Sequence, residues 1–246
     1  MSLVKAKTFS VSQCKMPQFI VWSPKLSPQI VSFLSLTYSI NYSLRTTEKP
    51  LLNSIAFKSI DAEVIIELLM KLTADEFTNK YALIDCRYPF EYNGGHIKLA
   101  VNIYDRKKLV DYFYPNDALR FIEISRKIPI FYCEYSKIRG PNMAYALRAE
   151  DRIRNKLNYP MVDYLEMYIL DRGYKNFYEI NQRINKDCCE PDAYIPMNDP
   201  RFISDLMNYD LHRSKSTSGT KSKSMKKQWK RKKRKKTSLD PVLEEV

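Results

Sequence analysis

The chain has 246 residues and a formal net charge of +13, because 41 Lys and Arg residues outnumber 28 Asp and Glu residues. Only five Gly and two His residues are present. The sequence therefore contains no Gly-rich nucleotide-binding turn and no pair of His residues spaced for a zinc site or a Ser/His/Asp triad. We predict that the protein uses no cofactor and no metal, and that its chemistry rests on other residue types.

The positive charge is concentrated near the C-terminus. Thirteen of the basic residues lie between Arg213 and Lys236, where there is no acidic residue, whereas residues 51–212 hold 22 basic and 24 acidic residues. This distribution predicts an irregular N-terminal arm over residues 1–50, a main domain over residues 51–212 and a basic disordered tail over residues 213–246.

Several features of the sequence indicate the compartment. No apolar stretch approaches the roughly 20 residues that a membrane span needs, and no signal peptide is recognisable near the start. The five Cys residues lack the regular spacing of a secreted disulfide framework. We therefore expect an intracellular protein in a reducing compartment, without a membrane partner.

The first clear element follows Asp61, which is placed to cap a helix. Five apolar residues then recur at the spacing of one helix face, which predicts an amphipathic helix packed on the core. They are Val64, Ile65, Leu68, Leu69 and Leu72.

Short apolar runs at residues 81–84 and 128–132 have the length of strands that are buried on both faces. Pro129 lacks an N–H donor, so we place it at the first position of the second strand. Strands that alternate with helices predict an α/β domain with a central, mainly parallel sheet flanked by helices. Two further helices and a third strand complete this pattern, over residues 116–126, 141–154 and 168–170.

The strongest chemical signal follows the strand at residues 128–132. A seven-residue loop opens with Cys133 and closes with Arg139, and Gly140 and Pro141 then begin the next helix. The N–H groups of such a loop can surround the oxygens of a phosphate-sized anion, while Arg139 donates two parallel hydrogen bonds. The same donors favour the thiolate of Cys133, which predicts a nucleophilic cysteine that needs no His base.

Around this loop the sequence resembles the M-phase inducer phosphatases, the dual-specificity phosphatases that activate cyclin-dependent kinases. The matching runs, which span roughly residues 56–212 in unbroken order, are Asp85 to Asn102, Cys133 to Ser136, Arg139 to Pro141, Tyr168 to Leu170, Gly173 to Lys175 and Cys189 to Pro191, together with Tyr194, Pro196 and Met197. The resemblance implies a rhodanese-like domain that removes phosphate from phosphotyrosine and phosphothreonine of a cyclin-dependent kinase in complex with a cyclin. It also implies a phosphocysteine intermediate and a role in promoting cell-cycle progression.

The resemblance further implies a role for each residue of the loop. Cys133 is the nucleophile that carries the phosphoryl group, Arg139 clamps the phosphoryl oxygens, and the backbone from Glu134 to Ile138 completes the cradle. Cys86 matches a second cysteine that forms a protective disulfide with an oxidised nucleophile. The predicted substrate-binding residues besides Arg139 are Tyr135, Ser136, Lys137 and Ile138.

Four polar residues within the first matching run are expected to have a structural role. Buried polar residues at strand ends usually bond to one another and to the backbone. We therefore expect Asp85, Arg87, Glu91 and His96 to hold the fold rather than to touch a substrate.

The sequence departs from the family around the loop. Tyr132 stands where the family has a His that supports the thiolate, Lys137 replaces a small hydroxyl residue, and Ile138 replaces a Glu. The loss of an acid matters because proton donation to the leaving group typically contributes about 10²- to 10⁴-fold to the rate. The remaining candidates for this acid are Glu134, Asp163 and Glu166.

Two other functions stay open. Tyr132 and Ile138 are compatible with a catalytically weak module that binds phosphoproteins. Arsenate reductases and sulfurtransferases use the same scaffold. The length of the loop favours a phosphatase over sulfur transfer, because related sulfurtransferases have a loop one residue shorter, which suits a smaller substituent on the cysteine.

The basic tail carries a targeting pattern. Lys226 and Lys227 are followed two residues later by seven consecutive basic residues, Lys230 to Lys236. This spacing is typical of a bipartite nuclear localisation signal, so we expect the protein in the nucleus and an import receptor among its partners. Trp229 is the only aromatic residue of the cluster and offers no stacking platform, so we do not expect nucleic-acid binding.

Overall fold

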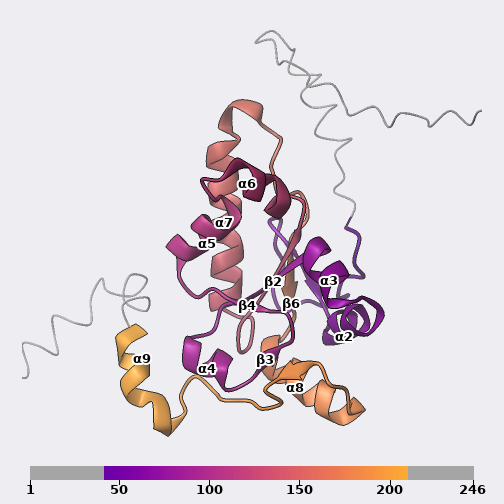
Figure 1. The fold of residues 1–246 in the computed structure, drawn as a ribbon, viewed down its shortest axis with the longest axis vertical. Coiled ribbons are helices and arrows are strands. Elements are labelled where there is room, and N and C mark those ends of the chain that lie inside the picture. Colours follow the sequence, from indigo (N-terminus) through magenta and orange to yellow (C-terminus); the bar gives the residue numbers. More distant parts are fainter. Residues whose placement is uncertain (1–41, 210–246) are drawn as a thin grey trace, which may run out of the picture.

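Residues 42–209 are described by the structure, a computed structural model, and they are built around one parallel sheet (Figure 1). Its five strands are β1 (Lys58–Ile60), β2 (Tyr81–Asp85), β4 (Val101–Asn102), β5 (Ile128–Tyr132) and β6 (Tyr168–Leu170). They lie in the order β1-β6-β5-β2-β4, and every neighbouring pair is parallel. The strands β3 (His96–Ile97) and β7 (Cys189–Glu190) form a separate antiparallel pair.

Helices connect the strands of the sheet. They are α2 (Ala62–Lys71), α3 (Ala74–Lys80), α4 (Pro89–Asn93), α5 (Arg106–Phe113), α6 (Ala118–Ile124), α7 (Arg139–Arg154), α8 (Gly173–Ile184) and α9 (Ile203–Tyr209). Two 3₁₀ turns are η1 (Lys156–Asn158) and η2 (Pro200–Phe202). Parallel strands need crossover connections of this kind, and the structure confirms the predicted α/β class with a central parallel sheet.

Each face of the sheet has its own group of helices and its own apolar core. Residues from α5, α6 and α7 form one core, and residues from α2, α3 and α8 form the other. Side chains along β5 alternate between the two cores, so Phe131 lies in the first while Ile130 and Tyr132 lie in the second. A strand buried on both faces explains the unbroken apolar run at residues 128–132.

Three local details differ from the sequence predictions. Pro129 is the second residue of β5 rather than the first, and it is tolerated near the strand end because β6 pairs with β5 only from Ile130 onward. Helix α7 begins at Arg139 instead of residue 141. Asp61 occupies the N-cap position of α2, but its carboxylate accepts a hydrogen bond from the Thr47 hydroxyl at 2.9 Å instead of capping the helix.

The last part of the predicted N-terminal arm packs against the sheet. Residues 42–50 contain no helix or strand, and the Thr47 N–H donates to the Ser59 carbonyl of β1 at 2.9 Å. This contact covers an edge strand, which limits pairing of the edge with other chains. Residues 1–41 and 210–246, including the predicted localisation signal, lie outside the described residues.

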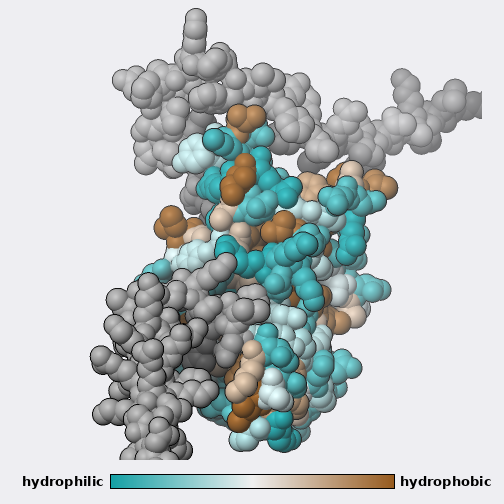
Figure 2. All heavy atoms as spheres, turned by 90° about the vertical axis from the view of Figure 1, so that its left-hand side faces the viewer, coloured by the Kyte–Doolittle hydropathy of each residue, from teal (hydrophilic) through white to brown (hydrophobic). Residues whose placement is uncertain are grey.

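The described surface is mixed in character. Figure 2 shows hydrophilic and hydrophobic residues interspersed on the side of the molecule that carries α5 and α7. Scattered exposed apolar side chains of this kind are usual in folded proteins. Within residues 42–209, no helix is long and apolar enough to cross a membrane.

Candidate active site

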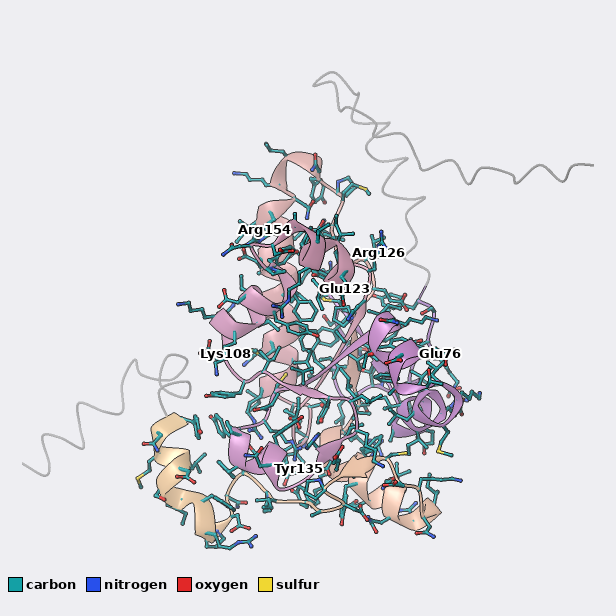
Figure 3. All side chains as sticks on the ribbon, in the orientation of Figure 1. Glu76, Lys108, Glu123, Arg126, Tyr135 and Arg154 are labelled. Atoms are coloured by element: carbon teal, nitrogen blue, oxygen red, sulfur yellow. The ribbon has the colours of Figure 1, made fainter. Side chains whose placement is uncertain are left out.

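The predicted loop lies at the carboxyl ends of the sheet strands. Cys133 follows β5 directly, and Cys86 follows the neighbouring strand β2. Figure 3 shows Tyr135 of the loop low in the view, while Glu123 and Arg126, which precede β5, lie in its upper half. Ligands of parallel α/β sheets bind at this carboxyl edge, so the fold presents the loop where a substrate binds.

The start of α8 fixes the first two peptide groups of the loop. The N–H groups of Tyr174 and Lys175 donate to the carbonyls of Cys133 and Glu134, at 2.9 and 3.1 Å. Gly173 permits this approach, since its φ is +70° and a Cβ atom there would lie 2.3 Å from the first of these carbonyl oxygens. The carbonyl and the N–H of a trans peptide group point in opposite directions, so the N–H groups of these two peptide groups point away from α8.

The N–H groups of the loop are free to bind an anion. Within residues 42–209, those from Glu134 to Ile138 have no protein acceptor, and the Cys133 N–H donates to the Ser136 hydroxyl at 3.4 Å. Helix α7 begins where the loop ends, so the positive end of its dipole faces the same point. The backbone therefore leaves free the donors that the predicted cradle requires, and anion binding itself stays a prediction.

Arg139, the first residue of α7, is positioned by a buried carboxylate. Its Nη2 donates to Glu91 Oε1 at 2.9 Å, and its Nη1 makes a second bond to the same carboxylate. The guanidinium also lies over the Tyr88 ring, 5.0 Å from its centroid. Burial acts to lower the pKa of Arg139, but the bonds to Glu91 outweigh burial and raise it. The N–H groups that Glu91 does not use stay available for phosphoryl oxygens.

Glu134, the first candidate for the general acid, is engaged as a hydrogen-bond acceptor. The Tyr194 hydroxyl donates to Glu134 Oε1 at 2.5 Å, and Glu134 Oε2 lies 3.7 Å from Arg139 Nη2. A general acid must instead present a proton to the leaving group. With these contacts Glu134 is placed to orient Arg139 and Tyr194, and it is not placed to donate a proton.

The other two candidates for the acid lie at the wrong edge of the sheet. Asp163 and Glu166 precede β6, whose first residue Tyr168 pairs with Ile130 of β5. Cys133 follows the far end of β5. With a rise of about 3.3 Å per residue, Glu166 lies on the order of 15 Å from the loop along the strand direction. The prediction that either residue supplies the acid is wrong, because a short strand separates them from the loop.

The rim of the cradle is formed by the outward-facing side chains of the loop. Tyr135, Lys137 and Ile138 are exposed, Ile138 by 68%. Lys175 of α8 lies over the Tyr135 ring, 5.9 Å from its centroid. Ser136 is 2% exposed and its hydroxyl accepts a hydrogen bond inside the loop, so it shapes the loop rather than lining the rim.

Cys86 lies beside the predicted nucleophile. The strand register pairs Asp85 with Tyr132, so the residues that follow them, Cys86 and Cys133, are neighbours across adjacent strands at a spacing of about 4.8 Å. Both are free thiols within one apolar cluster, and burial raises the pKa of Cys86. The spacing falls in the range that a disulfide requires, and the protective disulfide stays a prediction.

Comparisons with known proteins agree with this geometry. A family model described as a rhodanese-like domain matches residues 68–180. This match and the parallel sheet flanked by helices confirm the predicted rhodanese-like fold. Over 175 residues the chain is 45% identical to M-phase inducer phosphatase cdc-25.2 of Caenorhabditis elegans, a match that covers 71% of the chain and 35% of that relative. M-phase inducer phosphatase cdc-25.3 of Caenorhabditis elegans is 43% identical over 178 residues, covering 71% of the chain and 55% of that relative.

More distant relatives extend the comparison. M-phase inducer phosphatase 3 of Xenopus laevis is 41% identical over 141 residues, which cover 57% of the chain and 24% of that relative. The chain therefore spans roughly a quarter to a half of the relatives that it matches. A solved As-Sb reductase from Leishmania major is 24% identical with a TM-score of 0.40, over 53% of this chain and 83% of the reductase, a likeness too slight to bear on activity.

The site of the rhodanese-like domain includes three residues whose roles the sequence did not indicate. Glu91 was expected only to hold the fold; it has no exposed surface, and it also clamps Arg139. Tyr194 bonds to Glu134, and Gly173 admits α8 to the loop. All three residues belong to the part of the sequence that matches the family, but the match assigned none of them these contacts. Among residues 42–209, no group of His, Cys, Asp or Glu residues could hold a metal ion.

A methyl group at Gly173 should displace the loop of the rhodanese-like domain. We expect Gly173→Ala to lower the free energy of unfolding by about 1–3 kcal/mol through backbone strain, and to weaken protection of Cys133 from alkylation by tungstate about 10-fold or more. Asn185→Ala is the matched control, because Asn185 has a φ of +50° at the other end of α8. Unchanged tungstate protection in Gly173→Ala would contradict the anchoring role of α8.

The bond between Glu91 and Arg139 should make the catalytic rate depend on pH. Burial raises the pKa of Glu91, and the bonds from Arg139 oppose this shift only in part. Protonation as the pH falls through this raised pKa removes the charge that holds Arg139. We therefore expect kcat/KM for an aryl phosphate, wild type divided by Glu91→Gln, to be highest near neutral pH and to approach one in acid.

Division of the two profiles cancels the ionisation of the substrate, so the ratio reports only Glu91. A ratio that stays constant across the pH range would show that the charge of Glu91 does not act through Arg139.

Proposed function

We propose that the protein is a dual-specificity phosphatase that removes phosphate from phosphotyrosine and phosphothreonine of a cyclin-dependent kinase bound to a cyclin. The observation that carries this proposal is the loop from Cys133 to Arg139, where unpaired N–H groups and a guanidinium surround one point beside a cysteine. The similarity to M-phase inducer phosphatases supports a role in promoting cell-cycle progression.

In the first step, the Cys133 thiolate attacks the phosphorus atom of the substrate. A bond forms between sulfur and phosphorus, and the bond from phosphorus to the tyrosine or threonine oxygen breaks. The leaving oxygen takes a proton from water. The loop N–H groups and Arg139 stabilise the charge on the three phosphoryl oxygens, which is the main contribution a protein makes to phosphoryl transfer.

In the second step, a water molecule attacks the phosphorus atom of the phosphocysteine. The bond between sulfur and phosphorus breaks, the thiolate of Cys133 is restored, and inorganic phosphate leaves with the oxygen of the water. The same N–H groups and Arg139 hold the phosphoryl oxygens in both steps. No further reactant is needed, so the cycle is closed.

The departures from the family bear on turnover in different ways. Tyr132 has no exposed surface and lies in the core opposite to that of Cys133, so it takes none of the loop N–H groups. The loop therefore keeps the donors that both a phosphatase and a phosphoprotein-binding module require. Ile138 places an apolar side chain on the rim where the family has an acid. We therefore expect faster turnover of aryl than of alkyl phosphates, since aryl leaving groups need less proton donation.

Purified protein separates the candidate functions. We expect the wild type to hydrolyse an artificial aryl phosphate and Cys133→Ser to lose turnover while still retaining a phosphotyrosine peptide, because the loop N–H groups and Arg139 remain. Retention of the peptide by the wild type without release of phosphate would favour the binding module. Arsenate- or thiosulfate-dependent activity that exceeds the phosphatase activity would favour a reductase or a sulfurtransferase.

We further propose that the basic tail directs the protein to the nucleus through an import receptor. The support is the cluster of basic residues from Lys226 to Lys236, which lies outside the described residues. Fluorescently tagged chains with and without residues 213–246 should differ, the full chain gathering in the nucleus and the shortened chain spreading through the cell. An equal distribution of the two would contradict the proposal.

A further inference from the structure

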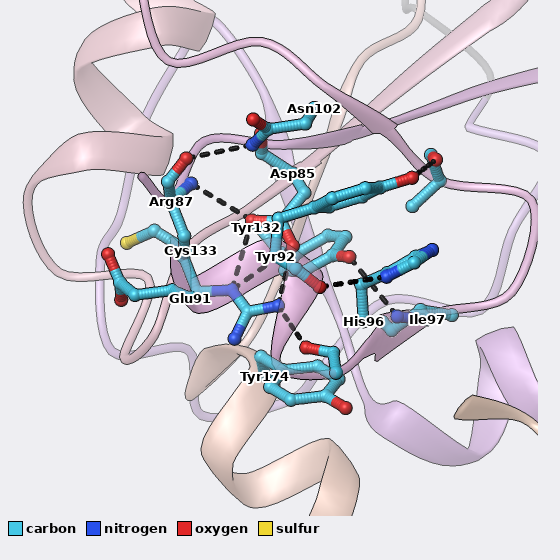
Figure 4. A network of polar contacts seen from close by, with 12 residues as sticks. Asp85, Arg87, Glu91, Tyr92, His96, Ile97, Asn102, Tyr132, Cys133 and Tyr174 are labelled. Atoms are coloured by element: carbon cyan, nitrogen blue, oxygen red, sulfur yellow. Dashed lines mark hydrogen bonds and ion pairs between the residues drawn. The ribbon is translucent and has the colours of Figure 1, made fainter. Parts of the chain in front are cut away.

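Tyr132, the residue before Cys133, has its side chain buried away from the mouth of the loop. It is the last residue of β5 and has no exposed surface. Figure 4 shows its side chain pointing away from that of Cys133, and the two belong to different cores. Its hydroxyl accepts a hydrogen bond from the Ile97 N–H at 3.3 Å. Any effect of Tyr132 on the reaction must therefore pass through its neighbours.

The ring of Tyr132 packs beside a buried guanidinium. The Arg87 guanidinium lies 5.8 Å from the centroid of the Tyr132 ring and 4.0 Å from that of Tyr174. Arg87 donates from Nε and Nη2 to Asp85 at 3.0 and 2.7 Å, and neither side chain of this pair is exposed. Nη1 of Arg87 is buried and has no acceptor among residues 42–209, and the guanidinium as a whole lies over the two rings.

Tyr174 connects this group to the loop. Its ring lies 6.2 Å from that of Tyr132, with an angle of 27° between the planes, and its hydroxyl donates to the Ala193 carbonyl at 2.8 Å. The N–H of the same residue donates to the Cys133 carbonyl at 2.9 Å. The position of the Tyr174 ring therefore sets the position of the donor that orients the first peptide group of the loop.

The Tyr132 backbone is fixed as well. Its carbonyl accepts a hydrogen bond from the Cys86 N–H at 2.8 Å. Cys133 is consequently held from both sides, through the peptide group before it and through its own carbonyl. The first contact is made by Tyr132 and the second by Tyr174, and the side chains of these two residues pack together with Arg87.

We propose that Tyr132 is a positioning residue that keeps the loop in its anion-binding shape through Arg87 and Tyr174, an inference that rests on the proposed phosphatase function. A smaller side chain would open a cavity beside Arg87, into which the guanidinium and the Tyr174 ring could move. The Cys133 carbonyl would follow the Tyr174 N–H, and the N–H groups of the loop would turn away from the phosphoryl oxygens. A displacement on the order of 1 Å at a reacting group costs about 100-fold in rate.

Three variants test this role. Tyr132→Leu removes the ring, and we expect kcat for an aryl phosphate to fall about 100-fold and inhibition by tungstate to weaken about 10-fold. Tyr132→Phe keeps the ring and loses the contacts of the hydroxyl with the Ile97 N–H and the Asp85 carboxylate, so kcat should stay within about fivefold of the wild type. Phe77→Leu is the matched control, because Phe77 is fully buried in the same core but its ring packs at a tilt against Tyr81, at the far end of β2 from the loop.

Thermal unfolding of each variant separates folding from positioning. We expect Tyr132→Leu and Phe77→Leu to melt at similarly lowered temperatures, whereas only Tyr132→Leu loses kcat and tungstate inhibition. If Tyr132→Leu does not fold, Tyr132→Met fills more of the space and is expected to show the same losses to a smaller extent.

Two outcomes would overturn the inference, and they are distinguishable. Wild-type kcat and tungstate inhibition in folded Tyr132→Leu or Tyr132→Met would remove the positioning role and leave the phosphatase intact. A wild-type protein that neither hydrolyses the aryl phosphate nor binds tungstate would remove the proposed function itself, and the positioning role with it.

Discussion

The site depends on two hydrogen bonds from the start of α8 to the first carbonyls of the loop. The N–H groups of Tyr174 and Lys175 turn the carbonyls of Cys133 and Glu134 away from the cradle, so the loop presents donors on its other side. Gly173 is required because any side chain would meet the loop backbone. An anion-binding loop assembled from one segment is thus held open by a helix that begins some 35 residues later in the chain.

Two arginines near the loop have separate tasks, and their acidic partners decide which task each performs. Arg87 is enclosed with Asp85 and contributes its charge to packing against two tyrosine rings. Arg139 is bound by Glu91, lies 3.7 Å from Glu134 and stays partly exposed at the mouth of the cradle. A guanidinium has more donors than one carboxylate can use, so Arg139 can be positioned and still bind an oxyanion.

The departures from the M-phase inducer phosphatases are unequal in consequence. The side chain of Tyr132 lies in a core, where its ring packs against that of Tyr174. It therefore leaves the N–H groups of the loop unoccupied. Ile138 faces outward, where it changes the chemistry of the rim without changing the backbone. Glu134 is occupied by Tyr194, so the loop presents hydrogen-bond donors while its own carboxylate is already engaged.

The sequence alone determined the α/β class, the strands at residues 81–84, 128–132 and 168–170, and the cradle loop, because these depend on local apolar runs and on adjacent residues. It did not determine the roles of Glu91 and Tyr194, nor the distance of Glu166 from the loop. Those facts depend on which edge of the sheet each segment reaches and on contacts between residues far apart in the chain. Only the tertiary structure decides them, because hydrogen bonds between distant segments leave no periodic pattern in either segment.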